Sequence, residues 1–216
     1  MRIGRLVRTC GMIAVAAACG TGVAQPPADP RPAKADPNTT PSTYRSFIVV
    51  DQRTDPKSLQ NRTGKLHDLV GENSLNPVVA VFSNAMPSGG DDAISKLVKK
   101  LKEVQSTHKA DEFGTFVIFA VLDTDYVIDT KADARAEELK AWAGTVQPGG
   151  VAIGLAKKSD GKEGDAKNWN LSPDNTSIVF YNRHKILKRW DVPTTGITDQ
   201  LLNEISAEVD KEIKRK

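Results

Sequence analysis

Cysteine is almost absent from this sequence. The chain has 216 residues and only two cysteines, Cys10 and Cys19, both within its first 19 residues. Thiol chemistry needs an ionisable sulfur as nucleophile or metal ligand. If the first segment is removed during export, the mature protein has no thiol, which excludes thiol–disulfide exchange.

The sequence also lacks an apolar run long enough to cross a membrane. Its N-terminal apolar run, residues 10–19, is shorter than the ~20 residues that a membrane-spanning helix needs. Three arginines precede this run and small residues follow it, which is typical of a cleavable export signal. We predict a signal peptide at residues 1–24, cut between Ala24 and Gln25, and therefore a periplasmic or extracellular protein.

A second interpretation of the same segment stays open. Residues 16–20 (AAACG) resemble a bacterial lipobox, in which Cys19 becomes the lipidated first residue, although Ala16 stands where such signals usually have leucine. The protein would then be an envelope lipoprotein, and only then do we expect membrane contact. A single acyl chain anchors a protein only marginally, so stable attachment would need more than one.

An excess of charge of one sign is missing too. The chain has 30 Lys and Arg against 27 Asp and Glu, and three of the arginines belong to the predicted leader. The mature chain is then nearly neutral. Nucleic-acid binders depend on a net basic surface that meets phosphates, so we expect no nucleic-acid partner.

Proline is concentrated in one segment. Six of the 12 prolines lie in residues 26–41, among small and polar residues. Such a composition cannot bury enough apolar surface to offset the entropy of ordering. We predict a disordered linker at residues 25–43, followed by one folded domain at residues 44–216.

The folded region begins with a predicted strand–helix–strand unit. Residues 77–82 (PVVAVF) and 115–122 (TFVIFAVL) are continuous apolar runs, as expected of strands that are buried on both faces. Between them, residues 94–104 carry apolar side chains at helical spacing, with Asp91 or Asp92 as the N-cap. This order predicts a parallel βαβ unit.

The remaining elements complete an α/β domain with a mixed sheet. We predict a strand at 46–50, a helix at 132–143 with Leu139 and Trp142 inward, a strand at 151–156, a hairpin of strands 176–181 and 185–190, and a final helix capped by Thr198.

This succession resembles the thioredoxin-like fold, from residue 77 to the C-terminus. The segment PVVAVFSN is similar to the strand that leads into the redox loop of that family, and TSIVFYNRHKIL is similar to its terminal hairpin. The resemblance implies a three-layer α/β sandwich with a central mixed sheet, in which a βαβ unit is followed by a hairpin and a helix. It is a resemblance to thioredoxins and peroxiredoxins without their redox cysteines.

The loop that carries the redox cysteines in that family has none here. Active members have Cys-X-X-Cys or one peroxidatic cysteine at this place, where the following helix N-terminus favours the thiolate. Residues 83–88 of this chain read SNAMPS. A serine hydroxyl ionises far above neutral pH and cannot replace the thiol.

The family also places a cis-proline before the first hairpin strand. Alignment on the hairpin puts Asn175 there, and Pro173 lies two residues earlier. A cis bond without proline costs about 3 kcal/mol, so we expect a trans bond at Asn175 unless the alignment slips and restores Pro173. The predicted binding surface consists of Ser83, Asn84, Met86, Pro87 and Asn175.

No metal or cofactor site is predicted. His67, His108 and His184 are scattered, without partners at metal-ligand spacing. Asp123 and Asp125 follow a predicted parallel strand, where paired carboxylates attract a cation, but strand ends entering solvent carry such residues without any ligand.

The sequence predicts an exported, redox-inactive module that binds an unidentified protein or small ligand, or acts structurally, and has no catalytic residue. The alternative is a thiol oxidoreductase of the thioredoxin or peroxiredoxin type, or an envelope lipoprotein whose chemistry is not visible in the sequence. A lipidated Cys19 would have its sulfur blocked and would not restore thiol exchange.

Overall fold

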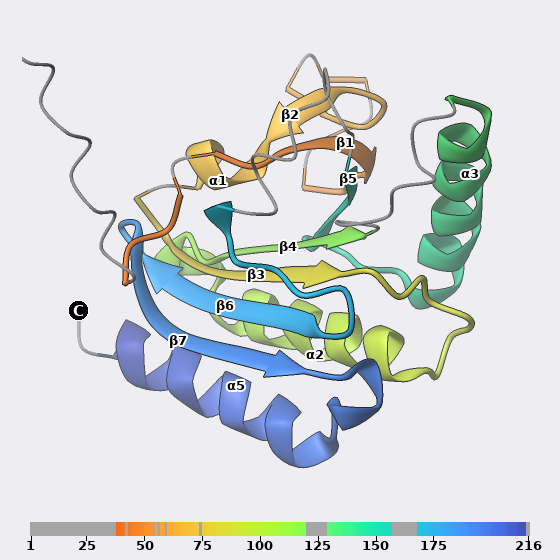
Figure 1. Cartoon of the computed structure of the whole chain (residues 1–216). Helices are drawn as coiled ribbons and strands as arrows, with labels where there is room; N and C mark the ends of the chain where they lie inside the picture. The colour runs from red at the N-terminus through yellow and green to blue at the C-terminus, as the bar shows by residue number, and fades with distance from the viewer. Residues whose placement is uncertain are drawn as a thin grey trace, which may run out of the picture. The chain divides into compact units, whose positions relative to one another are not determined.

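Seven strands form one mixed sheet in the order β2-β1-β5-β4-β3-β6-β7 (Figure 1). The computed structural model describes residues 38–41, 43–53, 55, 57–58, 60–73, 75–119, 129–156 and 168–214. The strands are β1 (Arg45–Val50), β2 (Leu66–Asp68), β3 (Pro77–Ser83), β4 (Gly114–Phe119), β5 (Ala152–Ala156), β6 (Thr176–Asn182) and β7 (Lys185–Val192).

The centre of the sheet is parallel and its two sides are antiparallel. β3 pairs with β4, and β4 with β5, in parallel, whereas β6 runs antiparallel to β3 and β1 antiparallel to β5. β7 and β2 close the two edges as antiparallel strands. The predicted α/β class is confirmed, with a central mixed sheet, a βαβ unit and a terminal hairpin and helix.

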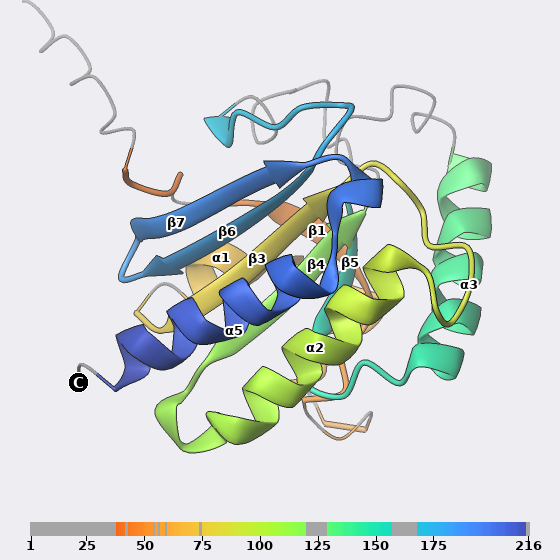
Figure 2. The same ribbon diagram turned by 90° about the horizontal axis from the view of Figure 1, so that it is seen from below.

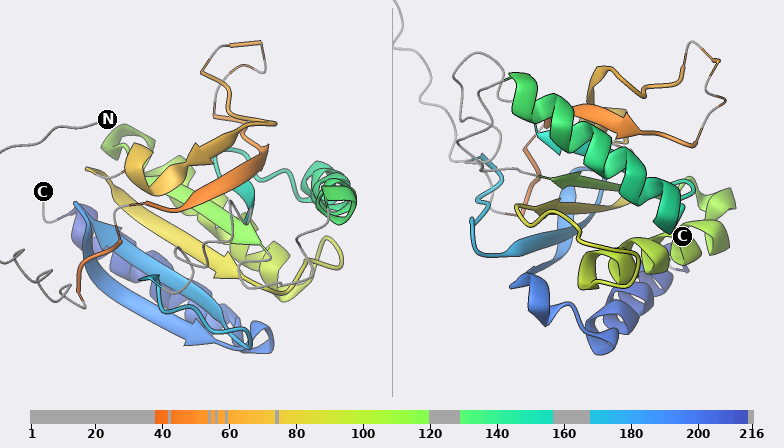
Figure 3. Two further views of the ribbon diagram at one scale, coloured as in Figure 1. Left: turned by 45° about the horizontal axis from the view of Figure 1, so that its top comes forward. Right: turned by 90° about the vertical axis from the view of Figure 1, so that its right-hand side faces the viewer.

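Three long helices cover one face of the sheet. They are α2 (Ala93–Thr107), α3 (Asp129–Val146) and α5 (Asp199–Ile213), and their buried side chains join one core with alternate strand residues. α2 and α5 lie side by side under the sheet (Figure 2), and α3 packs near β1 (Figure 3). We call this the helix-side core. Thr198 caps α5 as predicted.

The opposite face is covered by a short helix and by irregular chain. The four-residue helix α1 (Leu69–Glu72) packs there with Tyr44 and the segment around Trp169, on the side away from α2 and α5 (Figure 1). Trp169, Phe82 and Tyr44 form an aromatic cluster, with ring centroids 4.8–6.5 Å apart. We call this the opposite core. The sheet is thus the middle of three layers.

The sequence did not predict β2 and α1. Both are too short for a periodic pattern, and β2 contains the polar residues His67 and Asp68. Asp68 is the N-cap of α1, and its carboxylate stabilises the helix by accepting hydrogen bonds from the backbone N–H groups of Val70 and Gly71. Tertiary pairing with β1 supplies the rest of the stabilisation.

The hairpin turn is made by Arg183 and His184, both with positive φ, as in the tight turns that match the twist of a hairpin. The last residues of the predicted linker contact this turn: Thr40 N–H donates to the His184 carbonyl at 2.7 Å, and Thr39 bridges to Lys185. Hydrogen bonding to the domain therefore begins before Tyr44.

Several predicted features lie outside the described residues. They are the signal peptide with its cleavage site Ala24–Gln25, the cysteines including Cys19, most of the linker, residues 120–122 of the second apolar run, and Asp123 and Asp125. Of the helices that the structure describes, none is both long and apolar enough to span a bilayer.

The buried stripe of α2 gives a stability prediction. Leu97 is fully buried in the helix-side core, whereas the neighbouring Lys96 is exposed. Leu97→Ala should lower the free energy of unfolding by about 2–5 kcal/mol, since it removes apolar burial and leaves a cavity. Lys96→Ala, the matched control, should change it by no more than about 0.5 kcal/mol. Urea unfolding followed by far-UV circular dichroism measures both, and equal effects would contradict this packing.

Candidate functional site

Ser83 ends β3 and starts a chain of three hydroxyl groups, of which those of Ser83 and Thr176 are buried and that of Thr194 is half-buried. Its Oγ donates to the carbonyl of Ala85 at 3.1 Å and lies 3.3 Å from Oγ1 of Thr176. Thr176 Oγ1 lies in turn 3.3 Å from Oγ1 of Thr194. The antiparallel pairing of β3 with β6 brings these groups together, because Phe82 is opposite Ser177. All of them are hydrogen-bonding groups without an ionised partner.

Asn84 connects the loop to the segment before β6. Its side-chain Nδ2 donates to the Pro173 carbonyl at 3.1 Å. Asn175 is half-buried and directly precedes Thr176, whose hydroxyl contacts Ser83. The structure thus places the two predicted parts of the surface, the loop after β3 and the segment before β6, beside each other.

Met86 and Pro87 occupy the middle of the loop, and both are half-buried. Met86 packs against the helix-side core, so part of its side chain is used to hold the loop down. The remaining exposed part offers a soft apolar contact to a ligand.

Asp92 fills the N-terminus of α2 with its own carboxylate. Oδ1 accepts from Ser95 N–H at 2.7 Å, and Oδ2 accepts from the N–H groups of Ser88 at 2.6 Å and Gly89 at 3.1 Å. Burial by itself raises the pKa of Asp92, but the hydrogen bonds from Ser95, Ser88 and Gly89 outweigh it and hold this pKa below its ordinary value. The backbone N–H groups of Ser88, Gly89 and Ser95, which could otherwise bind an external anion, thus already bind the Asp92 carboxylate.

Trp142 of α3 fixes the other side of the loop. Its indole Nε1 donates to Ser95 Oγ at 2.8 Å and contacts the Gly89 carbonyl at 3.2 Å. Ser95 Oγ donates to the same carbonyl, and the Trp142 ring stands edge-on to Phe119, with centroids 5.6 Å apart. The loop is therefore held by the cap residue Asp92, by Ser95 of α2 and by Trp142 of α3.

The histidines occupy three separate environments. His67 contacts Arg62 and Glu72. His108, which follows the last residue of α2, has its Nε2 2.7 Å from Oδ1 of Asp210 in α5. His184, in the hairpin turn, contacts Thr40. Over the parts of the chain that the structure describes, no three His, Cys, Asp or Glu side chains are grouped in a way that could hold a metal ion.

Sequence reasoning missed Thr176, Thr194 and Trp142 as parts of this loop's surroundings. Trp142 was predicted as an inward residue of a helix, but its hydrogen bond to Ser95 depends on how two helices pack. The sequence predicts Asp91 or Asp92 as the cap, and the structure shows that it is Asp92; the carboxylate's bonds to Ser88 and Gly89 were not predicted.

The cap at Asp92 gives a prediction with a matched control. Asp92→Ala should cost about 0.5–2 kcal/mol at neutral pH, because three backbone N–H groups lose their acceptor. Asp91→Ala should change stability by less than about 0.5 kcal/mol, since among the described residues the contact of its side chain is an exposed ion pair with Lys99.

The same variant has an expected pH dependence. Because the pKa of Asp92 is lowered by folding, its contribution is present above the ordinary carboxyl pKa and is lost as the pH falls through the lowered value. The stability gap between wild type and Asp92→Ala should therefore shrink below about pH 4. Thermal unfolding across pH measures the gap, and a gap that widens in acid would contradict this role.

Comparison with solved structures identifies the architecture of the chain. No family model and no curated protein sequence matches the chain. Among solved structures, it is similar to a proposed protein disulfide isomerase from Bacteroides thetaiotaomicron, with a TM-score of 0.52 and 13% identity over 82% of this chain and 89% of that one.

A second similar structure is BsSco, a member of the Sco family of cytochrome c oxidase assembly proteins. The TM-score is 0.50, with 12% identity over 83% of this chain and 96% of that one. At sequence identities this low, the similarity shows a shared fold and does not show shared chemistry. Together with the order of strands and helices, these likenesses show that the chain has a thioredoxin-like fold.

Proposed function

We propose that this protein is an exported, redox-inactive thioredoxin-like module that acts by binding a protein partner or small ligand. The binding surface would be the loop after β3, with Ser83, Asn84, Met86 and Pro87, together with Asn175 before β6. The absence of cysteine from residues 20–216 carries the proposal.

The environment of the loop supports it further. In a redox-active loop the helix N-terminus favours a thiolate. In this chain Asp92 accepts hydrogen bonds from Ser88, Gly89 and Ser95, so these backbone donors are already satisfied. A second negative charge at this place would be repelled rather than stabilised.

The loop offers contacts suited to binding. Met86 and Pro87 present partly exposed apolar surface, and the half-buried Asn175 adds an amide that can donate and accept. The loop is held in place by Asn84, Asp92 and Trp142, so the loop is preorganised and would itself lose little conformational entropy when a ligand binds.

Export is proposed from the N-terminal pattern alone. A basic start, a short apolar run and small residues before Gln25 are typical of a signal peptide. The lipoprotein alternative uses the same segment, with Cys19 as the lipidated residue. In both cases the folded domain would function outside the cytoplasm.

The alternative function is a thiol oxidoreductase. One of the similar structures is described as a proposed protein disulfide isomerase. In this alternative, the chain would also catalyse thiol–disulfide exchange. It would require a thiol from Cys10 or Cys19 in the retained leader, near the sheet.

An activity assay separates the two functions. The protein isolated from its native host, with the N-terminus that it carries there, should neither reduce insulin in the presence of dithiothreitol nor consume peroxide above the buffer rate, because we predict that export removes or blocks both cysteine thiols. A thioredoxin with Cys-X-X-Cys serves as the positive control. Turnover that rises in proportion to the concentration of this protein would overturn the redox-inactive assignment.

The binding surface is tested by substitution in the loop. Met86→Ala should weaken capture of a partner from the native envelope fraction at least about thirtyfold if this side chain is an anchor, since truncation of an anchor costs about 2 kcal/mol or more. Leu75→Ala is the matched control, because Leu75 is 73% exposed and lies outside the loop. Equal capture by wild type and both variants would contradict a role for Met86.

A further inference from the structure

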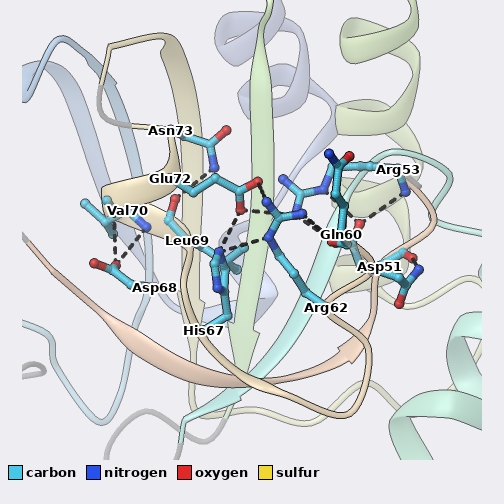
Figure 4. Close-up of polar contacts among 12 residues, drawn as sticks. Asp51, Arg53, Gln60, Arg62, His67, Asp68, Leu69, Val70, Glu72 and Asn73 are labelled. Atoms are coloured by element: carbon cyan, nitrogen blue, oxygen red, sulfur yellow. Dashed lines mark hydrogen bonds and ion pairs between the residues drawn. The ribbon is translucent and has the colours of Figure 1, made fainter. Parts of the chain in front are cut away.

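A group of charged side chains attaches the loop between β1 and β2 to α1. Figure 4 shows Arg53, Arg62 and His67 gathered around Glu72, with Asp51 beside the two arginines. This group lies away from the loop after β3 and has no part in the proposed function. We call it the charged cluster.

One half of the charged cluster is a buried ion pair. The Asp51 carboxylate is fully buried and accepts from Arg53 Nε at 2.8 Å and from the Arg53 terminal nitrogen at 2.9 Å. Burial alone raises the pKa of Asp51, but the paired Arg53, with Arg62 nearby, holds it below its ordinary value. This pair stays charged over the whole neutral range.

The other half centres on one nitrogen of His67. Nε2 lies 2.9 Å from Arg62 Nε, which can only donate, and 3.1 Å from Glu72 Oε2, which accepts as a carboxylate. Arg62 also forms an ion pair with Glu72 Oε1, and its other terminal nitrogen donates to the Gln60 carbonyl at 2.9 Å. A single ring nitrogen thus faces a donor and an acceptor at once.

Only one of these two contacts is a hydrogen bond in each protonation state. When the ring is neutral with its proton on Nδ1, Nε2 accepts from Arg62 and offers nothing to Glu72. When Nε2 takes a proton, it donates to Glu72 and turns an N–H toward the donor Nε of Arg62. The charged ring also repels the guanidinium, so protonation replaces one contact with the other.

We propose that His67 is a proton-dependent switch: protonation at Nε2 ends its contact with Arg62 Nε, replaces it with a hydrogen bond donated to Glu72 Oε2, and so loosens the loop segment 60–65 from α1. His67 is reachable for a proton from solvent, with a side chain 32% exposed. Arg62 keeps its ion pairs with Glu72 and with Asp51, whose Oδ2 lies 3.8 Å from a terminal nitrogen of Arg62, so the contact that changes is the one with His67.

The surroundings of His67 confine the switch to this loop. Within the charged cluster Arg53 contacts Glu72 at 3.4 Å and stays bound to Asp51. The neighbouring Asp68 is occupied by the N–H groups of Tyr44, Val70 and Gly71. On β1, Ser46 faces His67 in register and is neutral.

The base of the loop does not depend on His67. Asn61 donates to the Asp51 carbonyl at 3.1 Å, and Asp51 N–H donates to Thr63 Oγ1 at 3.0 Å. Gly64 N–H donates to the Ile48 carbonyl. These bonds keep the loop attached to β1, so the switch changes its mobility and not the fold.

Hydrogen exchange and NMR on the full chain test the switch. Histidine changes charge between about pH 5 and pH 8, so the amides of Thr63 and Lys65, which donate within the loop to Asn61 and Arg62, are compared at about pH 5.5 and pH 8, after correction for intrinsic exchange. Loss of one charge-assisted hydrogen bond should make them exchange about tenfold faster at the lower pH.

Two variants and the ring tautomer decide the outcome. His67→Gln, which cannot take a charge, should abolish the difference between the two pH values, whereas His184→Gln should retain it. Nitrogen-15 spectra of the wild-type ring should place the neutral proton on Nδ1. A difference that persists in His67→Gln, no difference in the wild type, or a neutral proton on Nε2 would each overturn the switch.

Discussion

β3 is buried on both faces of the sheet, and this burial decides how the neighbouring strands and both cores are arranged. All seven residues of Pro77–Ser83 are buried, and alternate side chains enter the helix-side core and the opposite core. A charged side chain in this strand would lose its hydration without gaining a partner. β4 and β6 pair with its two edges, so β3 also sets the register of the parallel unit and of the hairpin. The candidate loop begins where this burial ends.

The loop after β3 is stabilised by neutral hydrogen bonds and by one internal carboxylate. Asp92 satisfies backbone donors at the start of α2, and Trp142 joins the loop to α3 through Ser95. The chain has a thioredoxin-like fold, and its loop after β3 contains hydroxyl and amide groups and no cysteine. The proposed role of this loop in binding follows from those groups.

Sequence patterns identified the long elements and the loop, because both depend on local signals. Continuous apolar strands, helical spacing in α2 and the caps Asp92 and Thr198 all act within a few residues. The short elements β2 and α1 were not predicted, since three or four residues carry no period and their stability comes from pairing with β1. The partners of Ser83 and Asn84 were equally out of reach, because Thr176 and Pro173 are distant in the chain.

Composition limits the chemistry of this chain: it has no thiol after Cys19, nearly balanced charge, and apolar runs that require a covered sheet. The tertiary structure decided which groups meet. It placed the Asp92 carboxylate on the amides of the loop, Trp142 on Ser95, and His67 between Arg62 and Glu72. These contacts could not be predicted from local patterns, because residues that are remote in the chain meet only when strands pair and helices pack. Composition, by contrast, limits the available chemistry directly.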